Sequence, residues 1–145
     1  GIKMNEFKKF LSQTDLKEEY HDSNKIGFFI TESLAFASQV HIFHLLSLSG
    51  QKHLALKEFY SSLEDIIDSV AEKFIARGGK IESINYEFKT SSDVEFVLNT
   101  VSNYRDELTE IIDLMIDDSE NQGIFDELVE VQKEIDQFVY RFSLE

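Results

Sequence analysis

Long apolar repeats that no proline interrupts constrain this chain most. None of its 145 residues is proline, so every position keeps the backbone donor that a long helix requires. Apolar residues and two histidines recur at alternating spacings of three and four, the repeat of one face of an α-helix. The four stripes are Ile30, Leu34, Ala37, His41, His44 and Leu48; Leu56, Phe59, Leu63, Ile66, Val70 and Phe74; Val94, Val97, Val101, Tyr104, Leu108, Ile111 and Met115; and Leu128, Val131, Ile135, Phe138 and Phe142. The sequence therefore predicts an all-α fold.

Turn signals separate the four stripes. Ser47-Leu48-Ser49-Gly50 closes the first helix, Gly78-Gly79 stops the second, and Ser92 or Asp93 is the expected N-cap of the third. Residues 80–91 read as an extended connection with a weak strand signal near residues 84–88. A long crossover between helices two and three is typical of a ferritin-like four-helix bundle.

One bundle accounts for most of the chain length. We assign it to residues 24–145 and treat residues 1–23 as an N-terminal extension with room for one short helix.

Composition narrows the function. The 28 acidic residues outnumber the 14 basic ones and give a formal charge of −14, which argues against a nucleic-acid partner. There is no cysteine, so disulfides, thiolate metal sites and thiol catalysis are excluded. No unbroken run of about 18 apolar residues is present and the N-terminus lacks a signal-peptide layout. We therefore expect a cytoplasmic protein with no membrane partner.

Three of the four histidines, His41, His44 and His53, gather around the first turn. His41 and His44 occupy stripe positions where a bundle usually places leucine, and a buried imidazole is costly unless it finds a partner. One interpretation is a pair of hydrogen-bonded histidines near the end of the bundle. The other is a metal site, because neutral imidazole is the commonest ligand for transition metals.

A pair of carboxylates follows on the second helix. Asp68 and Glu72 are four residues apart and project from the same side. Their neighbours on that side are Ala71 and Ile75, which suggests a face covered by another surface. The alternative is a solvated helix face, which is common in an acidic chain.

Distance prevents these two groups from sharing one metal within a single chain. His53 and Asp68 are fifteen residues apart on one helix, or about 22 Å along its axis. Ligands of one ion each lie about 2 Å from it. Two antiparallel copies related by a two-fold axis would bring the histidines of one against the acids of the other. A site built from all these residues therefore requires at least a dimer.

The spacing of these residues resembles that of the Dps branch of the ferritin-like superfamily. The matching residues are His53, Phe59-Tyr60, Asp68-Ser69-Val70-Ala71-Glu72-Lys73 and Gly78-Gly79, which are similar to the H…Y…D-x-x-A-E-R…G-G motif of Dps helix two. The resemblance covers roughly residues 35–79. It implies an iron-oxidising site between two subunits, with histidines from one and carboxylates from the other.

The resemblance assigns His53, Asp68 and Glu72 as catalytic metal ligands and leaves the first histidine open. Without a gap the ligand falls on His41. With a turn three residues shorter, Phe43-His44-Leu45 is more similar to the Phe-His-Trp of the family and to small phage-encoded ferritin-like proteins, which favours His44. The implied metal is iron or another divalent transition metal, the implied activity is a ferroxidase, and the implied assembly is a homo-oligomer, from a dimer to a dodecamer.

Three departures support a different hypothesis. Leu45 stands where the family has tryptophan, Lys57 stands where many members have an acid, and the connection is too short for the small extra helix of Dps. They favour a ferritin-fold interaction or structural protein without a catalytic metal. The single Glu-x-x-His match, Glu18 to His21, is expected to lie outside the bundle helices, so we do not assign it to a di-iron site within one bundle.

Overall fold

The computed structural model describes residues 15–48 and 50–144, and this part of the chain is all-helical, as the stripes predicted. Its helices are α2 (Asp15–Leu46), α3 (Gly50–Ala76), α4 (Val94–Leu114) and α5 (Gln122–Phe142), with a short 3-10 turn, η1 (Ser119–Asn121), ahead of α5. No strand forms within these described ranges, and the weak strand signal near residues 84–88 falls in an irregular connection.

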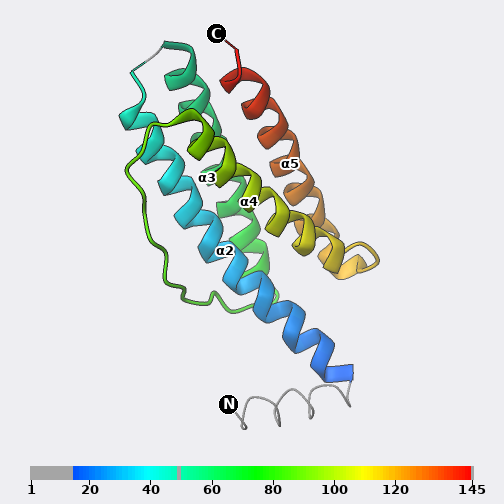
Figure 1. Ribbon diagram of the computed structural model, residues 1–145. Helices are drawn as coiled ribbons and strands as arrows, with labels where there is room; N and C mark the ends of the chain where they lie inside the picture. The colour runs from blue at the N-terminus through cyan, green and yellow to red at the C-terminus, as the bar shows by residue number, and fades with distance from the viewer. Residues whose placement is uncertain (1–14, 49, 145) are drawn as a thin grey trace.

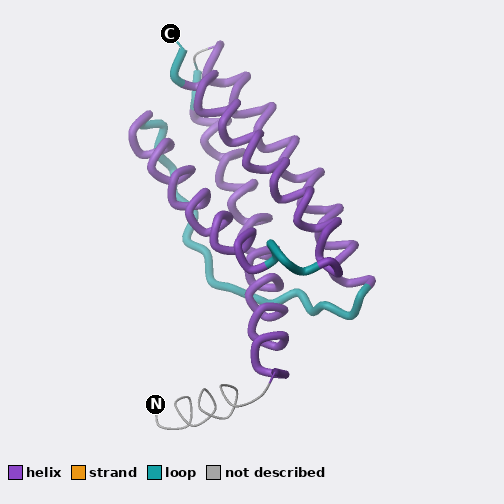
Figure 2. Tube along the Cα trace, turned by 90° about the vertical axis from the view of Figure 1, so that its right-hand side faces the viewer, coloured by secondary structure: helices purple, strands orange, loops and turns teal. Residues whose placement is uncertain are grey.

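The four helices pack side by side as a bundle (Figure 1). α2 and α3 form a hairpin, and the α3–α4 connection (residues 77–93) then runs back along α2 to the other end of the bundle. Consequently α3 and α4 run in the same direction and α5 returns between them (Figure 2). α2 contacts α3 and α4, and α5 contacts the same two helices. Each helix therefore has antiparallel neighbours.

The core confirms the stripes of the last three helices. Apart from Ile66, which is half-buried, and Val94, which is exposed, every residue of these stripes is buried. Aromatic pairs join the helices: Phe36 of α2 stacks on Tyr104 of α4 at 4.1 Å, and Phe59 of α3 stacks on Phe138 of α5 at 4.6 Å. Burial of one large apolar side chain contributes about 1.5–3 kcal/mol, so these facing stripes hold the bundle together.

The stripe predicted for α2 is wrong in part. Leu34 is 43% exposed and Leu48 is 96% exposed. Ile30, Ala37 and His44 of the predicted stripe are buried, but the buried face is centred between them and Phe36, Val40 and Phe43. α2 carries apolar residues on more than one face, so two overlapping repeats fit its sequence, and only the packing against α3 and α4 selects the buried one.

α2 begins earlier than the start expected for the bundle. It is helical from Asp15, so Glu18 and His21 lie on a bundle helix, and the expectation that this motif lies outside the helices is wrong. The short helix expected within residues 1–23 falls partly on residues 1–14, which lie outside the described residues.

Backbone and amide contacts hold the α3–α4 connection against α2. Gly27 makes this approach feasible, because a Cβ at that position would lie 2.2 Å from the Lys80 carbonyl oxygen. The buried amide of Gln39 donates to the Lys89 carbonyl at 2.8 Å and accepts from the Lys89 N–H at 2.7 Å. Gly78 begins the connection with a φ of 92° that favours glycine. The crossover is therefore fixed to α2 at both ends.

The N-cap prediction for the third helix is confirmed at Asp93, whose carboxylate accepts from the Phe96 N–H at 3.0 Å.

The segment Ser23–Leu46 of α2 is long and apolar enough to cross a membrane by length and composition. A core helix of a soluble protein passes the same test, and 56% of the most apolar part of this segment is buried inside the bundle. The hydropathy of α2 is therefore weak support for a membrane span.

Candidate functional site

The histidines that the sequence singled out meet at the turn between α2 and α3. The imidazole rings of His44 and His53 stack with centroids 3.8 Å apart. His41 stacks instead on Tyr60, at 4.2 Å and nearly parallel, and lies 5.9 Å from the His44 ring. His44 is buried, with 7% of its surface exposed, whereas His41 and His53 are half-buried. The structure therefore pairs His44, rather than His41, with His53.

Backbone carbonyls fix the orientation of both paired rings. His44 Nδ1 lies 3.0 Å from the His53 carbonyl oxygen, and His53 Nδ1 lies 3.1 Å from the carbonyl oxygens of His44 and Ser47. A carbonyl oxygen only accepts, so each Nδ1 carries the hydrogen. In a neutral ring this assignment leaves a lone pair on Nε2, the arrangement that metal-binding histidines commonly adopt.

The same hydrogen bonds also have a structural role. The last carbonyls of an α-helix lack partners within the helix, and His53 provides one for the end of α2. The interpretation as hydrogen-bonded histidines thus describes the Nδ1 atoms, while the metal-site interpretation concerns the Nε2 atoms.

Asp68 and Glu72 lie on the outer surface of α3, far from the histidines. Both are exposed, and α3 is one continuous helix from Gly50 to Ala76, so about 22 Å of helix axis separates His53 from Asp68. Within the described residues of a single chain, no three His, Cys, Asp or Glu side chains converge as a metal site would require. The structure places His44 with His53, and Asp68 with Glu72, and does not bring the two pairs together.

Exposed apolar side chains lie on the same outer surfaces as the two pairs. Leu54 and Ile75 are 55% and 54% exposed, and with Asp68 and Glu72 they fall within an arc of about 60° on α3. On α2, the exposed Leu34 and Leu45 share a face with His41 in the same way.

These two arcs flank the line of contact between α2 and α3, because the stacked His44 and His53 lie on their facing sides. We call the surface formed by Leu34, His41, Leu45, Leu54, Asp68, Glu72 and Ile75 the outer α2–α3 face. It combines exposed apolar side chains with candidate metal ligands.

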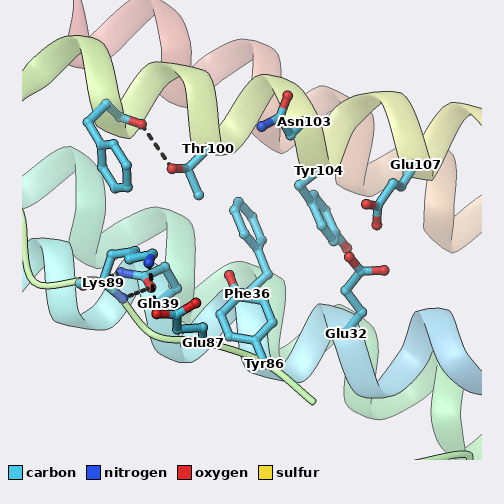
Figure 3. A pocket seen from close by; sticks show the side chains of 11 residues that line it. Glu32, Phe36, Gln39, Tyr86, Glu87, Lys89, Thr100, Asn103, Tyr104 and Glu107 are labelled. Atoms are coloured by element: carbon cyan, nitrogen blue, oxygen red, sulfur yellow. Dashed lines mark hydrogen bonds and ion pairs between the residues drawn. The ribbon is translucent and has the colours of Figure 1, made fainter. Parts of the chain in front are cut away.

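A second cluster, which the sequence analysis missed, lies between α2, α4 and the α3–α4 connection. Glu32 of α2 points toward Glu107 and Tyr104 of α4 (Figure 3). Burial raises the pKa of Glu32 to about 8, with further contributions from the hydrogen bond and the charge of the neighbouring Glu107 carboxyl. Burial also raises the pKa of Tyr86, on the connection, and the charges of the two glutamates add to that shift. Burial and like charge thus raise the pKa values of several neighbouring groups in this cluster, which makes it a candidate functional site.

No sequence signal identified this acid pair. Glu32 and Glu107 are two of 28 acidic residues, and 75 residues of sequence separate them. Their proximity results from the packing of α4 against α2, which periodicity does not specify.

Together, the fold and the two clusters define an all-α helical-bundle protein with a histidine pair at one hairpin and an acid pair inside. A family model matches residues 44–142, more than half of the chain, and the chain belongs to that family, DUF5856, a family of unknown function. The matched range includes His44, His53, Asp68 and Glu72, and it begins after His41. No curated protein and no solved structure matches the chain.

Proposed function

We propose that this protein is a Dps-like, ferritin-fold homo-oligomer that binds iron between two subunits and oxidises it. The proposed site takes His44 and His53 from one chain and Asp68 and Glu72 from a second copy, with His41 as the alternative first histidine. The proposal further treats the protein as cytoplasmic, with neither a nucleic-acid nor a membrane partner.

The order of the helices supports the ferritin-like part of the proposal. A short α2–α3 hairpin, a long connection that returns along α2, and a second hairpin from α4 to α5 give one crossover in a four-helix arrangement. Ferritin-like folds are four-helix bundles with one such crossover.

The orientation of the paired imidazoles is the observation that supports metal binding in this proposal. Both Nδ1 atoms are fixed by carbonyl oxygens, so both Nε2 atoms are left as acceptors on the same stacked pair. Imidazole nitrogens together with carboxylate oxygens suit Fe(II) and leave positions for an oxidant.

The outer α2–α3 face supports the proposal that the site forms between two subunits. Leu34, Leu45, Leu54 and Ile75 are all more than 40% exposed on this face, and contact with a second copy is one way to cover them. Antiparallel packing of two such faces would cover these side chains. The same packing would move Asp68 of one copy toward His53 of the other, which one chain alone cannot achieve.

Iron is the substrate in this reaction. Each Fe(II) loses one electron, and dioxygen or hydrogen peroxide accepts the electrons together with protons and leaves as water. The chain supplies nitrogen and oxygen ligands that hold Fe(II) and the more highly charged Fe(III) product, and the two carboxylates offset that charge.

An anaerobic Fe(II) titration, with the mass of the assembly measured by light scattering on the same sample, tests the proposal. We expect saturation at one or two iron ions per chain in a dimer or larger assembly. Asp68→Ala should abolish iron oxidation while the helical circular dichroism remains unchanged. Asp113→Ala is the matched control, because Asp113 is also an exposed helical aspartate but lies on α4. Binding by a monomer, or full activity in Asp68→Ala, would contradict the proposal.

A second candidate function is an interaction or structural protein that retains the bundle without a catalytic metal. The observation that favours it is the pair of Nδ1 bonds, which give His44 and His53 a role at the hairpin without any metal. Lys57 also favours this second candidate, because its exposed positive charge lies in the same arc of α3 as the proposed metal ligand Asp68. Absence of Fe(II) binding by an intact oligomer would select this candidate.

A further inference from the structure

A cavity of about 280 Å³ lies between α2, α4 and the α3–α4 connection. Its residues on α2, Glu32, Phe36 and Gln39, lie on the opposite side of that helix from Leu34 and His41, so the cavity shares no residue with the proposed iron site. Figure 3 shows Glu32, Tyr104 and Glu107 at one end of the cavity and Gln39, Glu87 and Lys89 at the other. This volume is close to the lower limit of pockets that hold small organic ligands, about 300 Å³.

Aromatic rings form much of the cavity wall. Phe36 stacks on Tyr104 at 4.1 Å with the ring planes 6° apart, and Phe96 and Tyr86 also line the cavity. The Tyr104 hydroxyl donates to Ser33 Oγ at 2.7 Å, and the Ser33 hydroxyl donates to the Phe29 carbonyl at 2.7 Å. These hydrogen bonds lock the Tyr104 ring in place.

The acidic end of the cavity lacks a cationic partner among the residues that line it. The one lysine of the lining, Lys89, lies at the far end with its ammonium 3.1 Å from the Glu87 carboxylate. Glu107 Oε2 is fully buried and finds no hydrogen-bond partner among the described residues. A buried carboxylate oxygen without a partner is costly, so this end of the cavity is suited to a donor that carries positive charge.

We propose that this cavity binds a small organic ammonium ion, with its charged nitrogen between Glu32 and Glu107 and its apolar part between Phe36 and Tyr86. An ammonium group donates several hydrogen bonds, which become stronger when the acceptor is ionised. Aromatic faces attract the same cation through their quadrupoles.

A divalent metal ion fits the cavity less well. Mg²⁺ and Ca²⁺ take six or more oxygen ligands, whereas this end supplies two carboxyls and one phenol that already donates its hydrogen to Ser33. The remaining wall combines three aromatic rings with five polar or charged side chains, namely Gln39, Glu87, Lys89, Thr100 and Asn103. An organic cation satisfies both the acids and the rings, and a metal ion satisfies only the acids.

Titration of the full chain with benzylamine, followed by two-dimensional NMR of the backbone amides, tests this assignment. Benzylamine is protonated at pH 7, and benzyl alcohol is its uncharged counterpart of nearly the same shape. We expect the amine to shift amide signals on α2, α4 and the connection. The alcohol should bind at least about ten-fold more weakly, the difference that a charge-assisted hydrogen bond provides.

Matched variants complete the test. Glu107→Gln should weaken benzylamine binding at least about ten-fold, whereas Glu110→Gln, an exposed acid one turn further along α4, should leave it unchanged. Unperturbed amide signals from α3 and α5 would show that each variant is folded. Equal binding of the amine and the alcohol would overturn the proposal, as would unaltered binding in Glu107→Gln. So would displacement of the amine by equimolar Mg²⁺ or Mn²⁺, which would assign the cavity to a metal.

Discussion

The histidine pair and the acid pair satisfy their polar atoms in opposite ways. At the α2–α3 hairpin, the rings of His44 and His53 stack and both Nδ1 atoms reach backbone carbonyls at 3.0–3.1 Å. In the cavity beside α4, Glu32 and Glu107 face each other, and Glu107 Oε2 has no partner among the described residues. The first cluster already contributes to stability, while the second opposes it.

This difference distinguishes two kinds of candidate site. Polar groups that bond to their own backbone stabilise the fold whether or not a ligand binds. Polar groups that remain buried without partners reduce stability, and such strain is frequent at functional sites. Substitution should therefore have opposite effects on stability in the two clusters.

His44→Ala is expected to have the largest effect. It removes a buried ring, the stack on His53 and the hydrogen bond to the His53 carbonyl, and should lower the free energy of unfolding by about 2–4 kcal/mol. Urea denaturation followed by circular dichroism measures the loss. His41→Ala is the comparison variant, because His41 is half-buried and stacks only on Tyr60. A loss no greater than that of His41→Ala would contradict the structural role of the histidine pair.

Gly27→Ala tests the connection that forms one wall of the cavity. The new Cβ would lie 2.2 Å from the Lys80 carbonyl oxygen, so the connection must move, at an expected cost of about 1–3 kcal/mol. Gly50→Ala is the control, because nothing lies within 4 Å of a Cβ at that position. Equal stabilities of the two variants, measured by urea denaturation, would show that the connection does not depend on this close approach.

Glu32→Gln should change how stability depends on pH. The pKa of Glu32 is about 8 in the folded chain, against 4.5 for the ordinary carboxyl, so the folded state binds more protons than the unfolded state between these values. The contribution of Glu32 is therefore fully present below about pH 4.5 and is lost as the pH rises through 8. Because the side chain is half-buried and solvent screens its charge, we expect an effect on the order of 1 kcal/mol.

The measurement compares unfolding free energies of the wild-type and Glu32→Gln proteins at pH 6 and pH 9. Subtraction removes the groups that do not interact with Glu32. Glu107 and Tyr104 on α4 and Tyr86 on the connection do interact with it, so the difference reports the titration of the whole cluster. The variant should gain stability relative to the wild type at pH 9. Glu87→Gln, at the other end of the cavity, should not. An identical pH dependence in the wild type and Glu32→Gln would show that the acid pair does not lower the stability of the folded chain at high pH.

Sequence reasoning predicted the helices well because their signals are local. The stripes of α3, α4 and α5 are carried by residues three and four apart, and turns at Gly78 and Asp93 use conformational preferences of single residues. On α2 the predicted stripe is right at Ile30, Ala37 and His44 and wrong at Leu34, because Leu34 and Phe36 are both apolar and only packing decides which is buried.

The candidate sites were predicted to different extents for the same reason. The histidines lie within thirteen residues of one another around one turn, so their proximity was readable, although the choice of His44 as the partner of His53 required the ring geometry. The position of Asp68 and Glu72 against a second copy stays a prediction, because it depends on an interface between chains.

The sequence by itself determined four long helices, the turns that separate them and the grouping of histidines at one turn, since each follows from spacing along a single element. The tertiary structure decided which face of α2 is buried, and it placed Glu32 opposite Glu107 across 75 residues of sequence. The physical reason is that helix periodicity fixes directions around one axis, whereas the pairing of two helices depends on the combined burial of all their side chains.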